Sequence, residues 1–179
     1  MAETWVALEL DVRLFDVDRW APYTDRCRSA GLRLTTYAEV GDSAANRRRL
    51  YELNRDCAAD IPGRGPFYTY EAYVRERVDV PAFDPRGIVL ALTPDGAWAG
   101  MAATSDRRAS GYVYNEMTGV RREHRRTGAA VAMKVHGIGF AGLCGVHRVR
   151  TVHHAANTKA IAMNRMLGYV DADHRESTG

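Results

Sequence analysis

One segment of the sequence, residues 118–130, constrains the fold more than any other. It reads Thr-Gly-Val-Arg-Arg-Glu-His-Arg-Arg-Thr-Gly-Ala-Ala, so an apolar stretch is followed by a loop with four arginines and then by a typical helix start. A strand, a loop and a helix in series place free backbone amides and the positive end of a helix dipole together. Gly128 would let a phosphate approach the backbone. The segment therefore predicts a pyrophosphate site.

Composition indicates a globular protein of one domain. The 179 residues are 46% hydrophobic and 26% charged, with a net charge of +3 concentrated in residues 121–126. This charge suits a small phosphorylated ligand, and we expect no nucleic-acid partner. Three cysteines without metal spacing, no signal peptide and no long apolar run predict a cytoplasmic protein with no bound metal and no membrane segment.

Hydrophobic periodicity predicts an α/β fold with a mixed, twisted sheet flanked by helices. Residues 5–14 alternate as in a half-buried strand, and a helix that stops near Gly31 follows. The order from residue 32 onward places helices on both faces of the sheet. We expect strands at 32–40, 87–92, 97–105, 112–120 and 148–154, helices from 42 or 43 to before Pro62 and at 69–78, 127–143 and 158–167, and a short strand from Tyr169.

Two motifs resemble signatures of the GNAT superfamily of N-acetyltransferases. The first, Arg125-x-x-Gly128-x-Ala130, is similar to the acyl-CoA loop, and the second, from Asn157 to Tyr169, is similar to the family's Leu-Gly-aromatic ending. The resemblance covers about residues 33–174. It implies a GNAT domain at 33–179 after a strand-helix extension at 1–32, acetyl-CoA or another acyl-CoA as co-substrate, and a small-molecule amine as acceptor.

The resemblance also implies how acyl-CoA binds. The strands at 112–120 and 148–154 should splay apart, so that residues 118–120 pair with the pantetheine arm, while amides of residues 125–130 hold the pyrophosphate. The residues assigned to acyl-CoA are Thr118, Gly119, Val120, Arg121, Arg125, Arg126, Thr127, Gly128, Ala129, Ala130 and Asn157. The family usually carries glycine where this chain has Arg126, which either adds a phosphate contact or points into solvent.

The amino-terminal strand resembles the closing strand of a GNAT domain. Tandem two-domain members of the family carry a comparable segment between their halves, so the chain resembles the second half of such a protein. The strand could complete the sheet within its own chain, exchange with a second copy in a homodimer, or stand free.

Three residues are candidates for the acid–base chemistry of acyl transfer, which needs a base for the amine and stabilisation of the leaving thiolate. Glu116 is expected on one sheet face with Tyr114 and Val120, where it acts as the base or is simply a paired surface residue. His153 ends a strand and is a base, a substrate contact or a hydrogen-bonded structural residue. Asn164 stands where the family often has a tyrosine acid, and its amide can only hydrogen-bond the sulfur.

Aromatic residues mark the expected acceptor side. Tyr68 and Tyr114 are the candidate substrate contacts, whereas Tyr70 and Tyr73, at helical spacing, are expected in the core. The leading hypothesis is an acyl-CoA-dependent N-acyltransferase for a metabolite or an antibiotic-like amine. One alternative is an acyl donor on an acidic carrier protein docked at the arginines of residues 121–126. A second is a CoA-binding sensor without catalysis.

Overall fold

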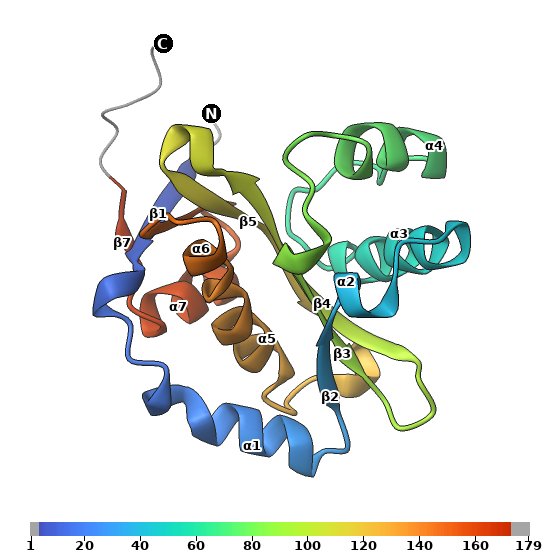
Figure 1. Ribbon diagram of the computed structural model, residues 1–179, viewed down its shortest axis with the longest axis horizontal. Coiled ribbons are helices and arrows are strands. Elements are labelled where there is room, and N and C mark those ends of the chain that lie inside the picture. Colours follow the sequence, from blue (N-terminus) through green and yellow to red (C-terminus); the bar gives the residue numbers. More distant parts are fainter. Residues whose placement is uncertain (1–3, 173–179) are drawn as a thin grey trace.

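A seven-stranded sheet runs through the molecule in the order β2-β3-β4-β5-β6-β1-β7, in a computed structural model that describes residues 4–172 (Figure 1). All neighbouring strands are antiparallel except β5 and β6, which are parallel. The strands are β1 (Trp5–Asp11), β2 (Arg33–Thr36), β3 (Ile88–Leu92), β4 (Trp98–Arg107), β5 (Tyr112–Val120), β6 (Arg148–His154) and β7 (Val170–Asp171). The mixed sheet predicted from the sequence is confirmed.

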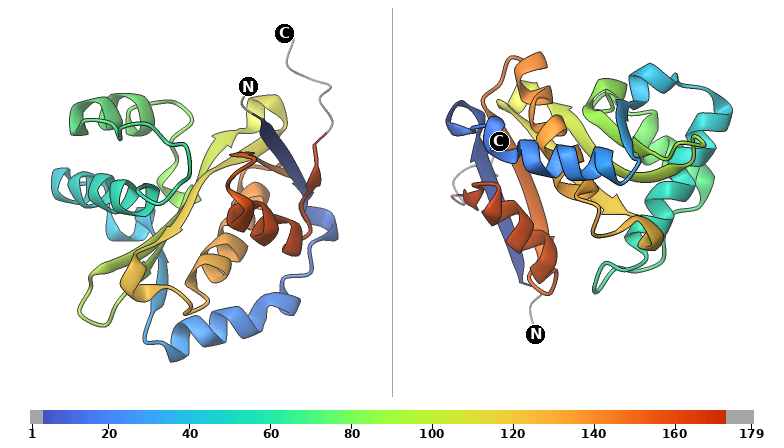
Figure 2. Two further views of the ribbon diagram at one scale, coloured as in Figure 1. Left: turned by 180° about the vertical axis from the view of Figure 1, so that it is seen from behind. Right: turned by 90° about the horizontal axis from the view of Figure 1, so that it is seen from below.

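Helices cover both faces of this sheet (Figures 1 and 2). They are α1 (Ala21–Ser29), α2 (Tyr37–Val40), α3 (Ala44–Ala58), α4 (Tyr70–Tyr73), α5 (Ala129–Ile138), α6 (Phe140–Leu143) and α7 (Thr158–Met166). The helices α1, α5, α6 and α7 lie on one face, and α2, α3 and α4 lie on the other. None of the helices in residues 4–172 is long and apolar enough to cross a membrane.

Buried side chains hold each helical layer on the sheet. On the first face, Val135 of α5 packs in one cluster with Leu8 of β1 and Val149 of β6. On the second face, Leu53 of α3 packs with Met101 of β4. Because both faces are covered, strand β3, which lies between β2 and β4, is buried at every position.

The amino-terminal strand completes the sheet within its own chain. Strand β1 pairs with β6 over its whole length, from Trp5 opposite His154 to Asp11 opposite Arg148, and with β7 on its other side. Leu8 and Leu10 are buried, as the alternation predicts. The alternative of a free-standing strand is therefore wrong, and the edge of β6 is filled without exchange between copies.

Three predicted elements are shorter or less regular than expected. The strand expected at 32–40 ends at Thr36, because the Thr36 hydroxyl accepts from the Glu39 amide while the Glu39 carboxylate accepts from the Thr36 amide, a capping box that starts α2. The helix expected at 127–143 breaks at Gly139, between α5 and α6. The helix expected at 69–78 becomes a π-helix over Val74–Val78 after α4.

Candidate functional site

Strands β5 and β6 separate partway along their length, as expected. They pair only at Val113 with Val149 and at Tyr114 with Arg150. Beyond these residues β5 remains paired with β4 as far as Val120, whereas β6 remains paired with β1. The Thr151 hydroxyl of β6 still donates to the Asn115 carbonyl at 3.0 Å, so one edge of β5 is open from residue 116 to residue 120. An open edge can pair with an extended ligand.

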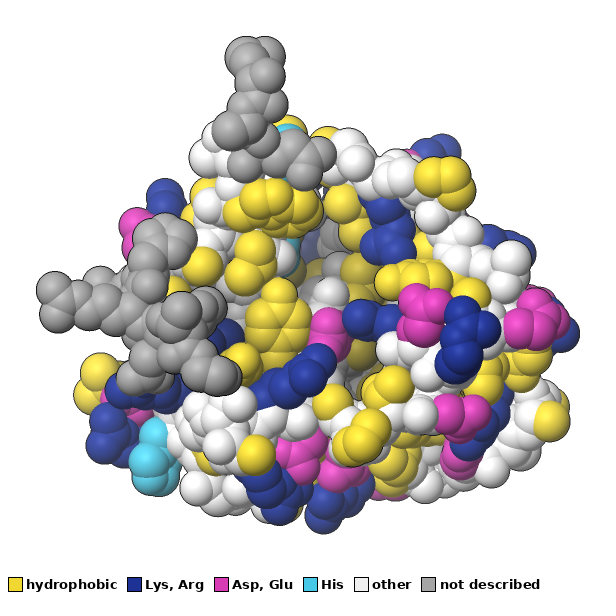
Figure 3. Space-filling view, turned by 90° about the horizontal axis from the view of Figure 1, so that it is seen from above, with side chains coloured by type: hydrophobic (Ala, Val, Ile, Leu, Met, Phe, Trp, Pro, Cys, Tyr) yellow, Lys and Arg dark blue, Asp and Glu magenta, His cyan; other side chains and the backbone are white. Residues whose placement is uncertain are grey.

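A cavity of about 540 Å³ occupies this splay. Its walls are residues 115–120 of β5, residues 152–154 of β6 and one side of α7 from Ala160 to Asn164. Figure 3 shows the surface hollowed near the centre of the view, with hydrophobic and basic side chains around the hollow. The predicted residues that line the cavity are Glu116, Thr118, Gly119, Val120, Arg125, Ala130, His153, Asn157 and Asn164.

Other predicted residues lie away from this cavity. Tyr68 packs against Phe67 and Tyr73 and lines neither this cavity nor the smaller one described below, and Tyr114 lines neither. Tyr73 is buried, as expected for a core residue. No three His, Cys, Asp or Glu side chains within residues 4–172 gather as a metal site.

Free backbone amides stand at the start of α5. The Arg125 amide donates to the Arg122 carbonyl at 3.3 Å, but the amides of residues 126–131 donate to no residue among 4–172. The N-cap of α5 is Gly128, which has no side-chain capping bond. Six unsatisfied donors therefore lie at the positive end of a ten-residue helix, an arrangement that binds anions. The free amides begin at Arg126, one residue after the predicted Arg125.

Helix α1 packs against the loop that precedes α5. Gly128 has φ +82°, and a Cβ there would lie 2.8 Å from the Tyr23 carbonyl oxygen of α1. Arg26 of α1 also donates to the Arg126 carbonyl at 2.5 Å. In Figures 1 and 2, α1 lies alongside α5. Gly128 is thus required by its backbone conformation and by the approach of α1, in addition to any approach of a phosphate.

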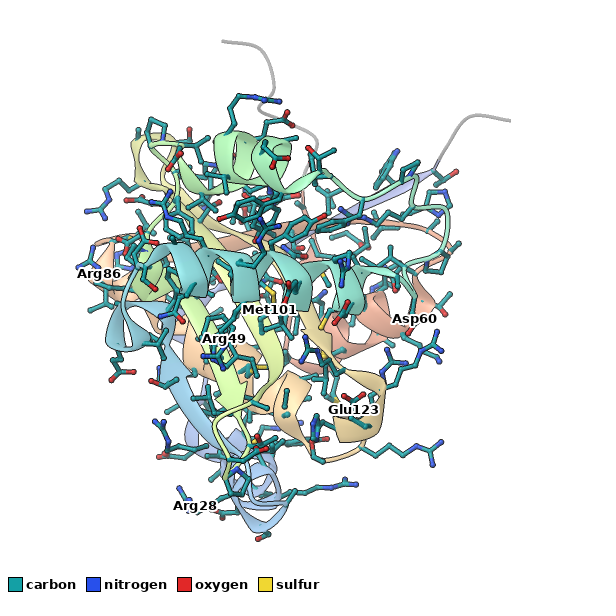
Figure 4. The ribbon with its side chains drawn as sticks, turned by 90° about the vertical axis from the view of Figure 1, so that its right-hand side faces the viewer. Arg28, Arg49, Asp60, Arg86, Met101 and Glu123 are labelled. Carbon is teal, nitrogen blue, oxygen red and sulfur yellow. The ribbon has the colours of Figure 1, made fainter. Side chains whose placement is uncertain are left out.

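The loop arginines are less free than the sequence suggested. Arg121 pairs with Asp56 at 3.0 Å, and Arg122 and Arg125 both pair with Asp60, which follows α3 and lies beside this loop (Figure 4). Hydrogen bonds from these two guanidinium groups hold the pKa of Asp60 well below its ordinary value. Asp56 on α3 and Asp60 just after it therefore neutralise part of the positive charge expected in this loop.

Arg126 differs from its three neighbours. It forms no ion pair with a described residue, and its backbone has φ 65°, the left-handed conformation that favours glycine. Among residues 4–172 it is the one non-glycine residue with positive φ. The chain therefore keeps the backbone shape of a glycine at this position although it carries an arginine.

Glu116 and Val120 lie on opposite faces of the sheet, although they were expected to share one. The register of β5 against β4 passes from Met117 to Asn115, so Glu116 is the extra residue of a β-bulge. The bulge reverses the alternation, and Val120 packs in the cluster with α5 while Glu116 faces the π-helix after α4. The expectation that Glu116 and Val120 share a face is wrong for this reason.

The Glu116 carboxylate is well held. It accepts from the Ser105 hydroxyl at 2.6 Å and from Arg77 at 3.0 Å, with Arg107 at 3.6 Å, and its side chain is 16% exposed. It also lines a second, smaller cavity of about 60 Å³ on the α3 and α4 side. Both cavities share Glu116 and Met117 as walls, so the carboxylate stands between them.

His153 and Asn164 lie side by side. The Asn164 amide nitrogen is 2.7 Å from His153 Nε2 and also donates to the Ala160 carbonyl at 3.0 Å. Because the amide is a donor, Nε2 is the acceptor and the imidazole is neutral. Burial, and secondly the charge of Lys134, lower the pKa of His153 to about 4. His153 is therefore neutral near neutral pH and has no imidazolium proton to give.

Sequence reasoning missed Lys134, whose side chain reaches the inner end of the large cavity. The residue is 2% exposed, and its Nζ donates to Asn115 Oδ1 at 2.6 Å. Burial lowers the pKa of Lys134 from 10.5 to about 7. A signal was present in the sequence, since Lys134 is one of two lysines in a chain rich in arginine and interrupts the apolar run of α5.

Comparison with known proteins places the chain in a family. The model of the acetyltransferase (GNAT) family matches residues 47–169. The chain belongs to the acetyltransferase (GNAT) family. No curated protein matches the sequence.

Solved structures of GNAT proteins share the fold. A GCN5-related N-acetyltransferase from Sphaerobacter thermophilus is 20% identical, with a TM-score of 0.66 over 94% of this chain and 48% of that one. A tandem GNAT protein from the clavulanic acid biosynthesis pathway is 21% identical, with a TM-score of 0.63 over 94% and 50%. AAC(6')-Iy, solved with the bisubstrate analogue CoA-S-monomethyl-acetylneamine, is 16% identical, with a TM-score of 0.58 over 83% and 97%. The chain thus spans about half the length of the first two structures.

Proposed function

We propose that this GNAT protein transfers an acyl group from acetyl-CoA, or another acyl-CoA, to the amine of a small molecule. The observation that carries the proposal is the continuity of one cavity from Ala130, at the free amides of α5, along the open edge of β5 to His153 and Asn164. Free amides at a helix start suit a pyrophosphate, and an open strand edge suits the amide-bearing pantetheine arm. Acyl-CoA combines these two groups.

The acceptor amine would enter from the smaller cavity. That cavity meets the larger one at Glu116 and Met117, so an amine held there faces the thioester across the bulge of β5. Glu116 can take the proton that the amine loses on attack, directly or through water. The fixed hydrogen bonds from Ser105 and Arg77 keep the carboxylate in this position.

The structure of AAC(6')-Iy supports the donor class, because that neighbour was solved with the bisubstrate analogue CoA-S-monomethyl-acetylneamine. The pairing of the loop arginines with Asp56 and Asp60 leaves less free positive charge for an acidic carrier protein. Free acyl-CoA is therefore the donor that we favour.

Calorimetry with acetyl-CoA, combined with a thiol-release assay over a panel of amines, tests the proposal. The matched variants are Ala130→Glu and Ala45→Glu, since both alanines are the second residue of a helix. A carboxylate at residue 130, which lines the cavity, should repel the pyrophosphate and weaken acetyl-CoA binding by about tenfold or more. A carboxylate at residue 45, which is exposed on α3, should leave binding unchanged.

Three results would speak against the proposal. The absence of heat with every CoA thioester would refute the donor assignment. Binding without thiol release on any amine would favour a CoA sensor. Release from an acyl carrier protein but not from acyl-CoA would favour the carrier-bound donor.

A further inference from the structure

A buried lysine without an acidic partner needs an explanation. Lys134 is 2% exposed, and the ion pairs among residues 4–172 do not include it. Its partners are the neutral Asn115 amide oxygen at 2.6 Å and the Tyr169 ring, whose centroid is 5.0 Å from Nζ. Lysine is rarely buried without a compensating charge, because the ammonium loses its hydration. Folding stability alone therefore does not account for this residue.

Its position relative to the proposed donor site is defined by α5. Ala130 and Lys134 are four residues apart, so they share one face of the helix, and both line the large cavity. The helix rises about 6 Å between them. Ala130 lies among the free amides, whereas Nζ is bonded to Asn115, the residue at which β5 leaves β6. A CoA whose pyrophosphate rests on those amides would carry its sulfur toward Nζ.

The other polar groups at this end of the cavity are poor proton donors. His153 on β6 is neutral, because its pKa is lowered to about 4. Asn164 on α7 has only an amide, and its Oδ1 is buried without a described partner. Tyr169, whose ring packs against Lys134, does not line the cavity, and burial raises the pKa of its phenol above the ordinary value. Glu116 on β5 is paired with Arg77 on the opposite face.

We propose that Lys134 donates a proton to the coenzyme A thiolate when the acyl group leaves, an inference that rests on the proposed function. The acceptor nitrogen forms a bond to the thioester carbonyl carbon, and the carbon–sulfur bond breaks with its electron pair moving to sulfur. The Lys134 ammonium passes one proton to that sulfur, and Glu116 takes the proton lost by the amine. Glu116 then releases its proton to solvent and Lys134 takes one up from solvent, so that each cycle is balanced.

Burial and charge explain the separate roles of Lys134, Asn115 and Asn164. An ammonium beside sulfur stabilises the thiolate by proximity of opposite charge, and a pKa near neutrality lets the ammonium release its proton readily. Asn115 orients Nζ by accepting its hydrogen bond. Asn164, which stands at the family position of the tyrosine acid, is left to orient His153.

The first test is the pH profile of thiol release from acetyl-CoA, with water as acceptor so that no amine titrates. In the wild type kcat should fall by up to about tenfold per pH unit above pH 7, because the Lys134 ammonium loses its proton there. Lys134→Met should lack this fall. Arg28→Met, which removes an exposed positive charge on α1, is the control and should keep it.

The second test separates proton donation from a structural role. Lys134→Met should lower kcat for thiol release from acetyl-CoA by about 100-fold, with Kd for acetyl-CoA within about twofold of the wild type. With para-nitrophenyl acetate, whose phenolate leaves without a proton, the two proteins should react at equal rates. The reaction uses the amine found active, or water as acceptor.

The outcomes distinguish this inference from the proposed function. If the wild type does not bind CoA, both are wrong. If it binds CoA but its kcat does not fall above pH 7, or if Lys134→Met keeps kcat within about threefold, only the role of Lys134 is wrong. An equal defect on both donors would also overturn that role, because it would indicate a distorted site.

Discussion

Replacing Lys134 with methionine should stabilise the protein, and the gain should be largest below pH 7. Methionine has a similar length, carries no charge and suits an irregular buried site. The Asn115 amide oxygen that bonds Nζ also accepts from the Thr118 hydroxyl at 3.3 Å, so it keeps one partner in the variant. The main consequence of the substitution is therefore the removal of a buried charge.

The expected magnitude follows from two pKa values. In the unfolded chain the lysine keeps its proton up to 10.5, whereas in the folded protein burial lowers the pKa to about 7. Below pH 7 both states are protonated, and the folded state bears the whole penalty of a buried charge, on the order of 5 kcal/mol. Between pH 7 and 10.5 the unfolded state binds more protons, so the wild type gains about 1.4 kcal/mol of stability per pH unit.

Urea unfolding at pH 6.5, 7.5 and 9 measures this effect. Lys134→Met should be more stable than the wild type at pH 6.5, and the difference should shrink by about 2.5 kcal/mol by pH 9. The series starts at pH 6.5 because His153 also responds to the charge of Lys134 below that value. A difference that stays constant from pH 6.5 to 9, or a variant less stable than the wild type at pH 6.5, would refute the reasoning.

Three further predictions concern the loop and the neighbouring histidine. Arg126→Gly should raise the free energy of unfolding by about 1 kcal/mol, because φ 65° strains a non-glycine residue. Urea unfolding measures this change, and a lower free energy of unfolding in the variant would contradict the prediction. Gly128→Ala should lose more stability than Gly145→Ala, because its Cβ would meet the Tyr23 carbonyl at 2.8 Å while residue 145 has open space at a similar φ; equal losses would contradict this. The wild type should lose stability as pH falls from 6.5 toward 4, since the unfolded chain protonates His153 first, and His153→Gln should flatten that part of the acid unfolding curve.

The donor side of the site could be predicted from the sequence because its determinants are local. A strand, a loop and a helix start follow one another within residues 118–130, and the free amides at the start of α5 depend only on that order. The splay of β5 from β6 was expected from the family resemblance, and the strand pairing confirms it. The roles of these residues toward a ligand stay predictions.

The charges and the facing of the side chains could not be predicted, because they depend on contacts between distant residues. Asp60 neutralises Arg122 and Arg125 only because the end of α3 lies beside their loop. Glu116 and Val120 lie on opposite faces of the sheet because β5 has one extra residue relative to β4 between them. The burial of Lys134 needs Tyr169 on one side and Asn115 on the other.

The bulge at Glu116 explains how one strand presents side chains to both cavities. Residues 115 and 118 face α5, as their contact shows, whereas Met117 and Gly119 face α3, where a Cβ on Gly119 would meet Cys57 Cβ at 2.5 Å. Without the extra residue, the alternation that places Asn115 beside Lys134 would turn residue 119 away from α3. The bulge thus lets α3 pack closely on β5 while Glu116 faces the smaller cavity and Asn115 holds Lys134 at the larger one.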